Sequence, residues 1–241
     1  MDYEEFSTAL PNDRERQLEL SAAFPVLMRK VYLWMTLALI ITGFTAYYVA
    51  STPALITAII TTPAVFWVLA IAELALVFIL SWAINRLSLT VATIMFVVYS
   101  IINGATMSFI FLAYTMSSVA SVFFITAGTF AAMAAFGYFT KIDLSSMGKI
   151  LLMALIGVII ATIVNMFLKS SGLEMILNYV GVLIFVGLTA YDTQKIKEML
   201  MQAPDAGESA QKVALLGALS LYLDFINLFI YLLRIFGSRR E

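Results

Sequence analysis

Seven long apolar runs follow one another along this chain of 241 residues, and they constrain its fold more than any other feature. A helix that crosses a bilayer needs about 20 apolar residues, so each run is long enough to span. Run length, and the lack of the alternation that barrel strands show, favour helices. The sequence therefore predicts an all-α membrane protein, a bundle of seven transmembrane helices. The runs cover about 26–50, 64–85, 89–114, 119–139, 148–168, 173–201 and 210–236.

Composition supports this reading. Apolar residues make up 62% of the chain and charged residues 12%, whereas soluble domains have about 45–50% and 25%. These values exclude a water-soluble enzyme. A further apolar stretch at 54–62 is too short to span.

Three parts are expected along the chain: a polar, acidic cytoplasmic tail at 1–24, a seven-helix transmembrane domain at 25–237, and a short polar C-terminus at 238–241. The tail holds six acids and two arginines, with a short surface helix expected near 13–23. A secretory signal would instead begin with positive charge and have a shorter apolar core. We therefore expect no signal peptide.

The basic residues predict an orientation. With seven spans, ten of the 14 lysines and arginines lie on the side of the N-terminus and four on the other side. The positive-inside rule then places the N-terminus in the cytoplasm. Arg234, Arg239 and Arg240 oppose this distribution, so either the C-terminus lies outside or the last run re-enters.

Missing residue types limit the chemistry. The chain has no cysteine and no histidine, which excludes thiolate and imidazole ligands and a histidine pH switch. A net charge of −1 provides no basic field for nucleic acid. We expect no tightly bound cofactor. The expected partners are the lipid bilayer, calcium and protons, and the sequence identifies no protein partner.

Three acids inside the apolar runs carry the most information: Glu73, Asp192 and Asp224. A charge at the bilayer centre costs about 2.5–3.5 kcal/mol on insertion scales, and such residues usually face a bundle interior or water. For each acid the alternative is a neutral carboxyl satisfied by a neighbouring helix. Asp192 can also pair with Lys195 one turn later.

Two helix faces carry polar stripes. The last run has Ser220, Asp224, Asn227, Tyr231 and Arg234 on one face, so this helix is expected to be central or to line a cavity. The third run has Tyr99, Asn103 and Thr106 on one face, which indicates either hydrogen bonds between helices or pore lining.

The last two runs form a hairpin, in which Asp192 and Asp224 can approach each other. Counted from the ends of the two runs, the aspartates are offset by five residues, about 7.5 Å along a helix. Tilt or uneven helix ends can absorb that offset, so spacing permits a pair without requiring one.

Four stretches resemble the transmembrane Bax inhibitor motif family. SLYLDFINLFIYLLRIFG (220–237) is similar to its C-terminal signature, and GLTAYDTQKIK (187–197) to its preceding aspartate motif. RKVYLWMTLALIITGFTAYYVA (29–50) is similar to its first span, and IAELALVFILSWAINR (71–86) carries Glu73 where members have a second-helix acid. The resemblance covers about 25–237.

The resemblance implies a bundle whose last helix is surrounded by the other six. It also implies a pH-sensitive calcium leak channel, a bacterial plasma membrane location, and a proton-sharing pair at Asp192 and Asp224. Arg86 is the candidate latch for Asp192. Expected pore or cavity lining residues are Glu73, Asn103, Ser220, Asn227 and Tyr231, and a weak calcium site is expected at Asp192, Asp224 and Glu73.

The physical chemistry agrees with this role. Two adjacent carboxylates cannot both ionise cheaply, so the pair shares a proton and titrates as a unit. Calcium prefers hard oxygen ligands, which this chain supplies in Asp, Glu, Asn and Ser. A leak also needs weak binding.

Three other functions stay open. An intramembrane aspartyl protease would also use two aspartates, but Asp224 lies in Leu-Asp-Phe and not in Gly-x-Gly-Asp. A proton-coupled transporter of small solutes usually shows inverted repeats and broken helices. A non-conducting membrane regulator of other proteins has only the acidic tail 1–24 as a sequence feature.

Overall fold

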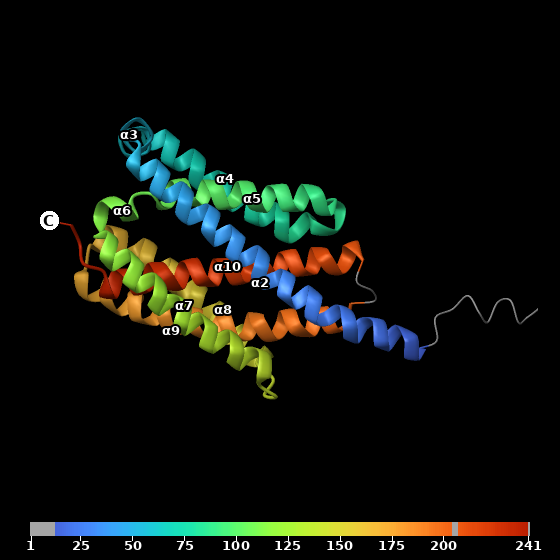
Figure 1. Cartoon of the computed structure of the whole chain (residues 1–241). Coiled ribbons are helices and arrows are strands. Elements are labelled where there is room, and N and C mark those ends of the chain that lie inside the picture. The colour runs from blue at the N-terminus through green and yellow to red at the C-terminus, as the bar shows by residue number, and fades with distance from the viewer. Residues whose placement is uncertain (1–12, 204–206, 241) are drawn as a thin grey trace, which may run out of the picture.

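The computed structural model describes residues 13–203 and 207–240, with side chains from residue 23 onward. Within those ranges the chain is helical and forms no strand (Figure 1). The expected surface helix near 13–23 is the beginning of α2, and residues 1–12 of the predicted tail lie outside the described part. The helices are α2 (Asp13–Ser51), α3 (Pro53–Thr61), α4 (Pro63–Ala83), the 3-10 turn η1 (Ile84–Arg86), α5 (Leu89–Met107), α6 (Ile110–Ala113), α7 (Met116–Phe139), α8 (Ser145–Leu168), α9 (Ser171–Met201) and α10 (Glu208–Phe236).

Local chemistry explains where the helices begin. Pro53 and Pro63 occupy the first positions of α3 and α4, where the missing N–H of proline leaves no bond unmade. Ser88, Thr115 and Ser170 precede α5, α7 and α9, and each side chain accepts a hydrogen bond from a backbone N–H of the first turn. The expected run 89–114 differs from the structure, because α5 ends at Met107 and the short α6 follows it.

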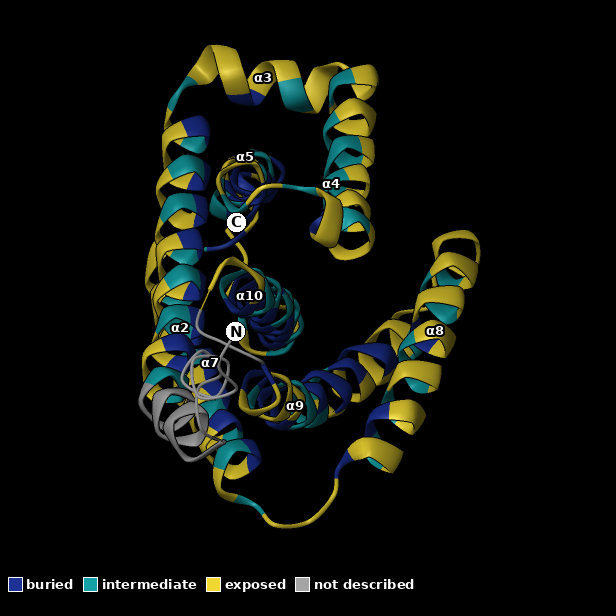
Figure 2. Cartoon of the chain, turned by 90° about the vertical axis from the view of Figure 1, so that its right-hand side faces the viewer, coloured by how far each residue is buried: buried dark blue, intermediate teal, exposed yellow. Residues whose placement is uncertain are grey.

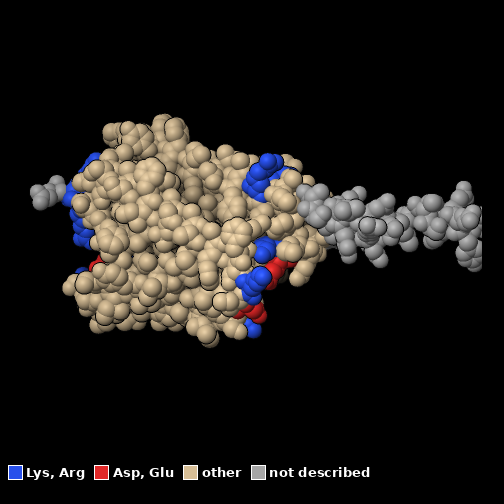
Figure 3. Space-filling model, turned by 60° about the horizontal axis from the view of Figure 1, so that its bottom comes forward, with Lys and Arg blue, Asp and Glu red and all other residues tan. Residues whose placement is uncertain are grey.

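Seven of these helices are long and apolar enough to cross a membrane, as predicted. The face shown in Figure 3 has its charged side chains at the two ends of the molecule, with a broad uncharged belt between them. Large apolar side chains such as Phe167 and Leu74 are exposed on the spans themselves. A surface of that kind suits lipid tails. The short α3 lies across one end and joins α2 to α4 (Figure 2).

The last helix is the centre of the bundle. About 67% of the apolar stretch of α10 is buried, the largest share among the seven spans, against 6% for α4 and for α8. α10 packs closely against α9, α2, α7 and α5. This confirms the predicted central last helix, with two exceptions. α4 packs on α5 and makes little direct contact with α10. α8 packs against α9 and faces α10 only across a cavity.

The two ends of the described chain lie at opposite ends of the bundle (Figure 1). α10 crosses the whole bundle without re-entering. Beyond it, the backbone of Ser238 and Arg240 is hydrogen-bonded to Thr115 and Ala113 in the turn between α6 and α7, at 3.1 and 2.9 Å. The three C-terminal arginines therefore lie on the side away from the start of α2.

Candidate functional site

The candidate site centres on two aspartates from neighbouring helices. Asp192 lies on α9 and Asp224 on α10, and their carboxyl groups face each other closely enough for a side-chain hydrogen bond. Such a bond needs a donor, so one carboxyl carries a proton when it forms. Asp224 is only 4% exposed, and its Oδ2 has no hydrogen-bond partner among the described residues. An orphaned carboxyl oxygen in an apolar interior calls for a proton, a water or a cation.

The register of α9 and α10 explains how the aspartates meet. On one side of the pair Gly181 lies against the Tyr231 ring, and on the other Gly217 lies against Ile196. A side chain at either glycine would overlap its neighbour, so the glycines allow this close packing. In this register α10 begins about one turn beyond the level at which α9 ends. The uneven ends absorb part of the offset that the hairpin loop alone would leave.

A cavity of about 460 Å³ lies beside the pair, between α8, α9 and α10. Gly148 on α8 packs against the Tyr191 ring at this cavity. Four members of the polar stripe expected on the last helix line this cavity: Ser220, Asp224, Asn227 and Tyr231. The fifth, Arg234, lies over the Tyr231 ring, with its guanidinium carbon 5.8 Å from the ring centre. The polar residues that line the cavity are Lys149, Tyr191, Asp192, Lys195, Ser220, Asp224, Asn227 and Tyr231.

A second cavity, of about 270 Å³, lies on the other side of Asp192. It is bordered by α9, α10 and, through Ser81, the last turn of α4. Asp192, Lys195, Ser220 and Leu223 line both cavities. Asp192 thus lies where the two cavities meet.

Glu73 belongs to a different polar cluster, formed by α4, α5, α10 and α2. The Glu73 carboxylate accepts hydrogen bonds from the Thr106 hydroxyl and, at 3.5 Å, from the Asn103 amide. The Tyr222 hydroxyl donates to Asn103 Oδ1 at 2.9 Å and lies 2.6 Å from the Thr42 hydroxyl. These bonds tie α10 to α2 and α5, and α5 in turn to α4.

The predicted site residues therefore separate into two groups. Tyr222 precedes Asp224 by two residues, about 200° around a helix, so Glu73 and Asn103 lie on the opposite side of α10 from the aspartate pair. In the described part of the chain, no three acidic residues gather closely enough to hold a metal ion. The expected calcium site of Asp192, Asp224 and Glu73 is accordingly not formed as one cluster. Sequence reasoning missed Thr42 and Tyr222, because a lone hydroxyl in an apolar run carries no signal.

Arg86, the predicted latch, ends η1 and lies over the Trp82 ring, with its guanidinium carbon 5.8 Å from the ring centre. The cation that faces Asp192 is instead Lys195, on the next turn of α9. A latch between Arg86 and Asp192 would require the guanidinium to leave Trp82. The latch stays a prediction.

Comparison with known proteins decides the family. The family model described as "Inhibitor of apoptosis-promoting Bax1" matches residues 25–241. The chain belongs to the Bax inhibitor family. Its relatives include the protein named inner membrane protein YbhL of Escherichia coli K12, 50% identical over 220 residues that cover 91% of this chain and 94% of the relative. Uncharacterized proteins of Borreliella burgdorferi and Caulobacter vibrioides are 43% and 38% identical, covering 89% and 98% of this chain and 92% and 97% of their own lengths.

The family match covers the four stretches on which the resemblance rests and every residue of the two polar clusters. Family membership and the seven apolar helices agree that this Bax inhibitor family chain is a multi-pass integral membrane protein.

Proposed function

We propose that this member of the Bax inhibitor family is a pH-sensitive calcium leak channel, gated by Asp192 and Asp224. The observation that carries the proposal is the position of the pair. Asp224 lies on the central helix, and Asp192 lines both cavities where they meet. A change of charge there acts where the two cavities meet.

The ligands around the pair suit a weakly held calcium ion. Calcium takes carboxylate, amide and hydroxyl oxygens, and Asp192, Asp224, Ser220 and Asn227 present such groups to the larger cavity. Two carboxylates are fewer than a tight calcium site normally has. Weak binding is what conduction needs, because an ion must leave as readily as it enters.

The pair also suits a proton switch. Two facing carboxyls hold a shared proton more strongly than separate ones do, and they titrate together. The other charged or titratable groups that line the cavity beside the pair are Lys149 on α8, Tyr191 and Lys195 on α9, and Tyr231 on α10. Protonation releases Asp192 from any latch to Arg86, but it also removes the negative charge that attracts calcium. These effects have opposite signs, so the flux can rise, fall or pass through a maximum with pH.

Calcium flux into proteoliposomes, measured across roughly pH 5–8, tests the proposal. The wild-type flux should change with pH, whereas Asp224→Asn and Asp192→Asn should each flatten that change, because the remaining aspartate loses its like-charged partner. Asparagine keeps the shape and the hydrogen-bonding capacity of the side chain, so the bundle should still fold.

Asp143→Asn is the matched control. Asp143 lies in the turn between α7 and α8, where hydrogen bonds from Ser145 hold the pKa of its carboxyl below the usual range. Asp143 therefore stays ionised above about pH 5, and the stability that it contributes is lost only as the pH falls through that lowered pKa. Its replacement should leave the flux profile unchanged.

The other outcomes separate the rival functions. If both asparagine variants keep the wild-type profile, the pair is no sensor and Glu73 becomes the next acid to test. If the latch exists, Arg86→Ala should raise the basal leak at high pH. Proton-driven uptake of a small solute would favour a transporter. Peptide cleavage that needs both aspartates would favour a protease. Correctly folded protein that conducts no calcium would favour a non-conducting regulator.

We further propose a plasma membrane location with the N-terminus in the cytoplasm. The E. coli relative is named an inner membrane protein. The side of the molecule at which α2 begins holds ten of the 14 basic residues, which is the cytoplasmic side by the positive-inside rule.

A further inference from the structure

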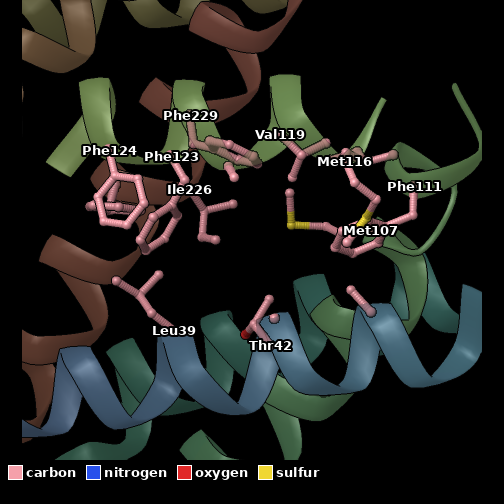
Figure 4. Close-up of a pocket in the computed structure, with 15 residues that line it drawn as sticks. Leu39, Thr42, Met107, Phe111, Met116, Val119, Phe123, Phe124, Ile226 and Phe229 are labelled. Atoms are coloured by element: carbon pink, nitrogen blue, oxygen red, sulfur yellow. The ribbon is translucent and has the colours of Figure 1, made fainter. Parts of the chain in front are cut away.

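A groove runs along the outside of the bundle between α2 and α7. Both helices pack against α10, but they make little direct contact with each other. Two pockets lie along the space between them. The first, of about 270 Å³, is near the end of α2, where Leu39 and Thr42 face Val119 and Phe123 of α7 (Figure 4). The second, of about 520 Å³, is near the start of the apolar span of α2, which begins at Ala23.

The second pocket has the dimensions of one leaflet. Its α2 wall runs from Pro25 to Met35, about 15 Å along a helix. Half of a hydrocarbon core is also about 15 Å thick. Apart from Arg29 and the two tyrosine hydroxyls, the walls are apolar over this length, with Met28 and Met35 on α2 opposite Phe130 and Ala134 on α7. From Arg29 to Met35 this wall is about 9 Å long, which fits the upper part of an acyl chain of one leaflet.

The mouth of the second pocket is basic. Arg29 lines it from α2, is exposed, and makes no ion pair among the described residues. Tyr138 lines it from α7, and the Lys197 ammonium lies 5.2 Å from the centre of the Tyr138 ring. Among the side chains that the structure describes, no acid lines this pocket. The charge at the mouth therefore complements a phosphate.

We propose that this groove binds an anionic phospholipid from the leaflet on the N-terminal side, with an acyl chain between α2 and α7 and its phosphate at Arg29. The lipid supplies the contact that α2 and α7 lack, and thereby supports both helices against α10. The binding site lies apart from the aspartate pair, so it does not depend on the proposed channel function.

Native mass spectrometry of the purified full chain tests the acyl-chain part. The protein is equilibrated with equal amounts of phosphatidylglycerol and phosphatidylcholine, and retained lipid is counted. Ala131→Phe fills the groove and should abolish retention. Ala132→Phe is the control, because Ala132 is the next residue on the same helix and does not line the pocket. Equal retention in the two variants would overturn the proposal, as would a lipid-free dimer that Ala131→Phe dissociates.

The head-group part is tested by charge. Wild type should prefer phosphatidylglycerol, and Arg29→Gln should reduce that preference about fivefold, the amount expected for one basic residue near anionic lipid. Arg86→Gln is the control, because Arg86 is exposed at the same end but lies over Trp82, away from the groove. If both variants lost the same share of the preference for phosphatidylglycerol, or if wild type had no such preference, the attraction would be general and the phosphate would not be bound at Arg29.

Discussion

Gly137→Ala tests whether α7 and α9 are as close as the structure places them. Gly137 on α7 lies against the backbone of α9, and an added Cβ would overlap the carbonyl group of Ala190. A side chain could rotate away, but this neighbour is backbone. α9 also packs against α8 and α10, so it cannot retreat without disturbing both contacts.

The expected size of the effect follows from two opposing contributions. Overpacking of a close contact costs about 1–3 kcal/mol. Replacing glycine by alanine within a helix returns about 0.5–1 kcal/mol, because alanine loses less backbone entropy. We therefore expect a net loss of about 0–2.5 kcal/mol in the free energy of unfolding.

Gly128→Ala is the matched control on the same helix. Nothing lies within 4 Å of a Cβ added at Gly128, so only the helix contribution remains. This variant should gain about 0.5–1 kcal/mol. The two substitutions are chemically identical and should have opposite signs.

Reversible unfolding of the purified protein in mixed micelles, followed by circular dichroism, measures both variants. If Gly137→Ala proved as stable as Gly128→Ala, α7 and α9 would not be in backbone contact. The result also concerns the candidate site, since Ala190 precedes Asp192 by two residues. Displacement of α9 should therefore change the pH profile of flux in Gly137→Ala but not in Gly128→Ala.

Three further predictions concern topology, selectivity and the second polar cluster. A single cysteine placed at Ser209, in a chain that otherwise has none, should resist an impermeant thiol reagent in intact cells, and ready external labelling would reverse the orientation. Flux assays should show calcium passage without preference for Zn²⁺ or Cu²⁺, because the chain has no His or Cys ligand; soft-metal transport without calcium movement would contradict this. Tyr222→Phe removes the hydrogen bonds to Thr42 and Asn103 and should lower the free energy of unfolding by roughly 1 kcal/mol, at about 0.6 kcal/mol for each bond between membrane helices. The exposed Tyr179→Phe should have no effect, and equal stability of the two variants would mean that these bonds do not stabilise the bundle.

The sequence by itself determined the spans and several of their ends. Each crossing of a bilayer needs about 20 apolar residues, and runs of that length can be recognised directly in the sequence. Pro53, Pro63 and the capping Ser88 mark helix starts through interactions within one turn. The polar stripe of the last helix could be read in the same way, because helix geometry alone places Ser220 and Asp224 on one face.

Only the tertiary structure decided which residues meet. A helical pattern gives the direction of each side chain but not the helix that covers it. In a membrane protein the covering helix is even harder to predict, because surfaces that face lipid and surfaces that face protein are both apolar. The packing of α9 on α10 brings Asp192 to Asp224, and the packing of α4 on α5 places Glu73 on the other side of α10. The sequence alone predicts neither contact. The Glu73 contact depends on packing between helices that are far apart in the chain, and the aspartate contact depends on the packing register of two neighbouring helices.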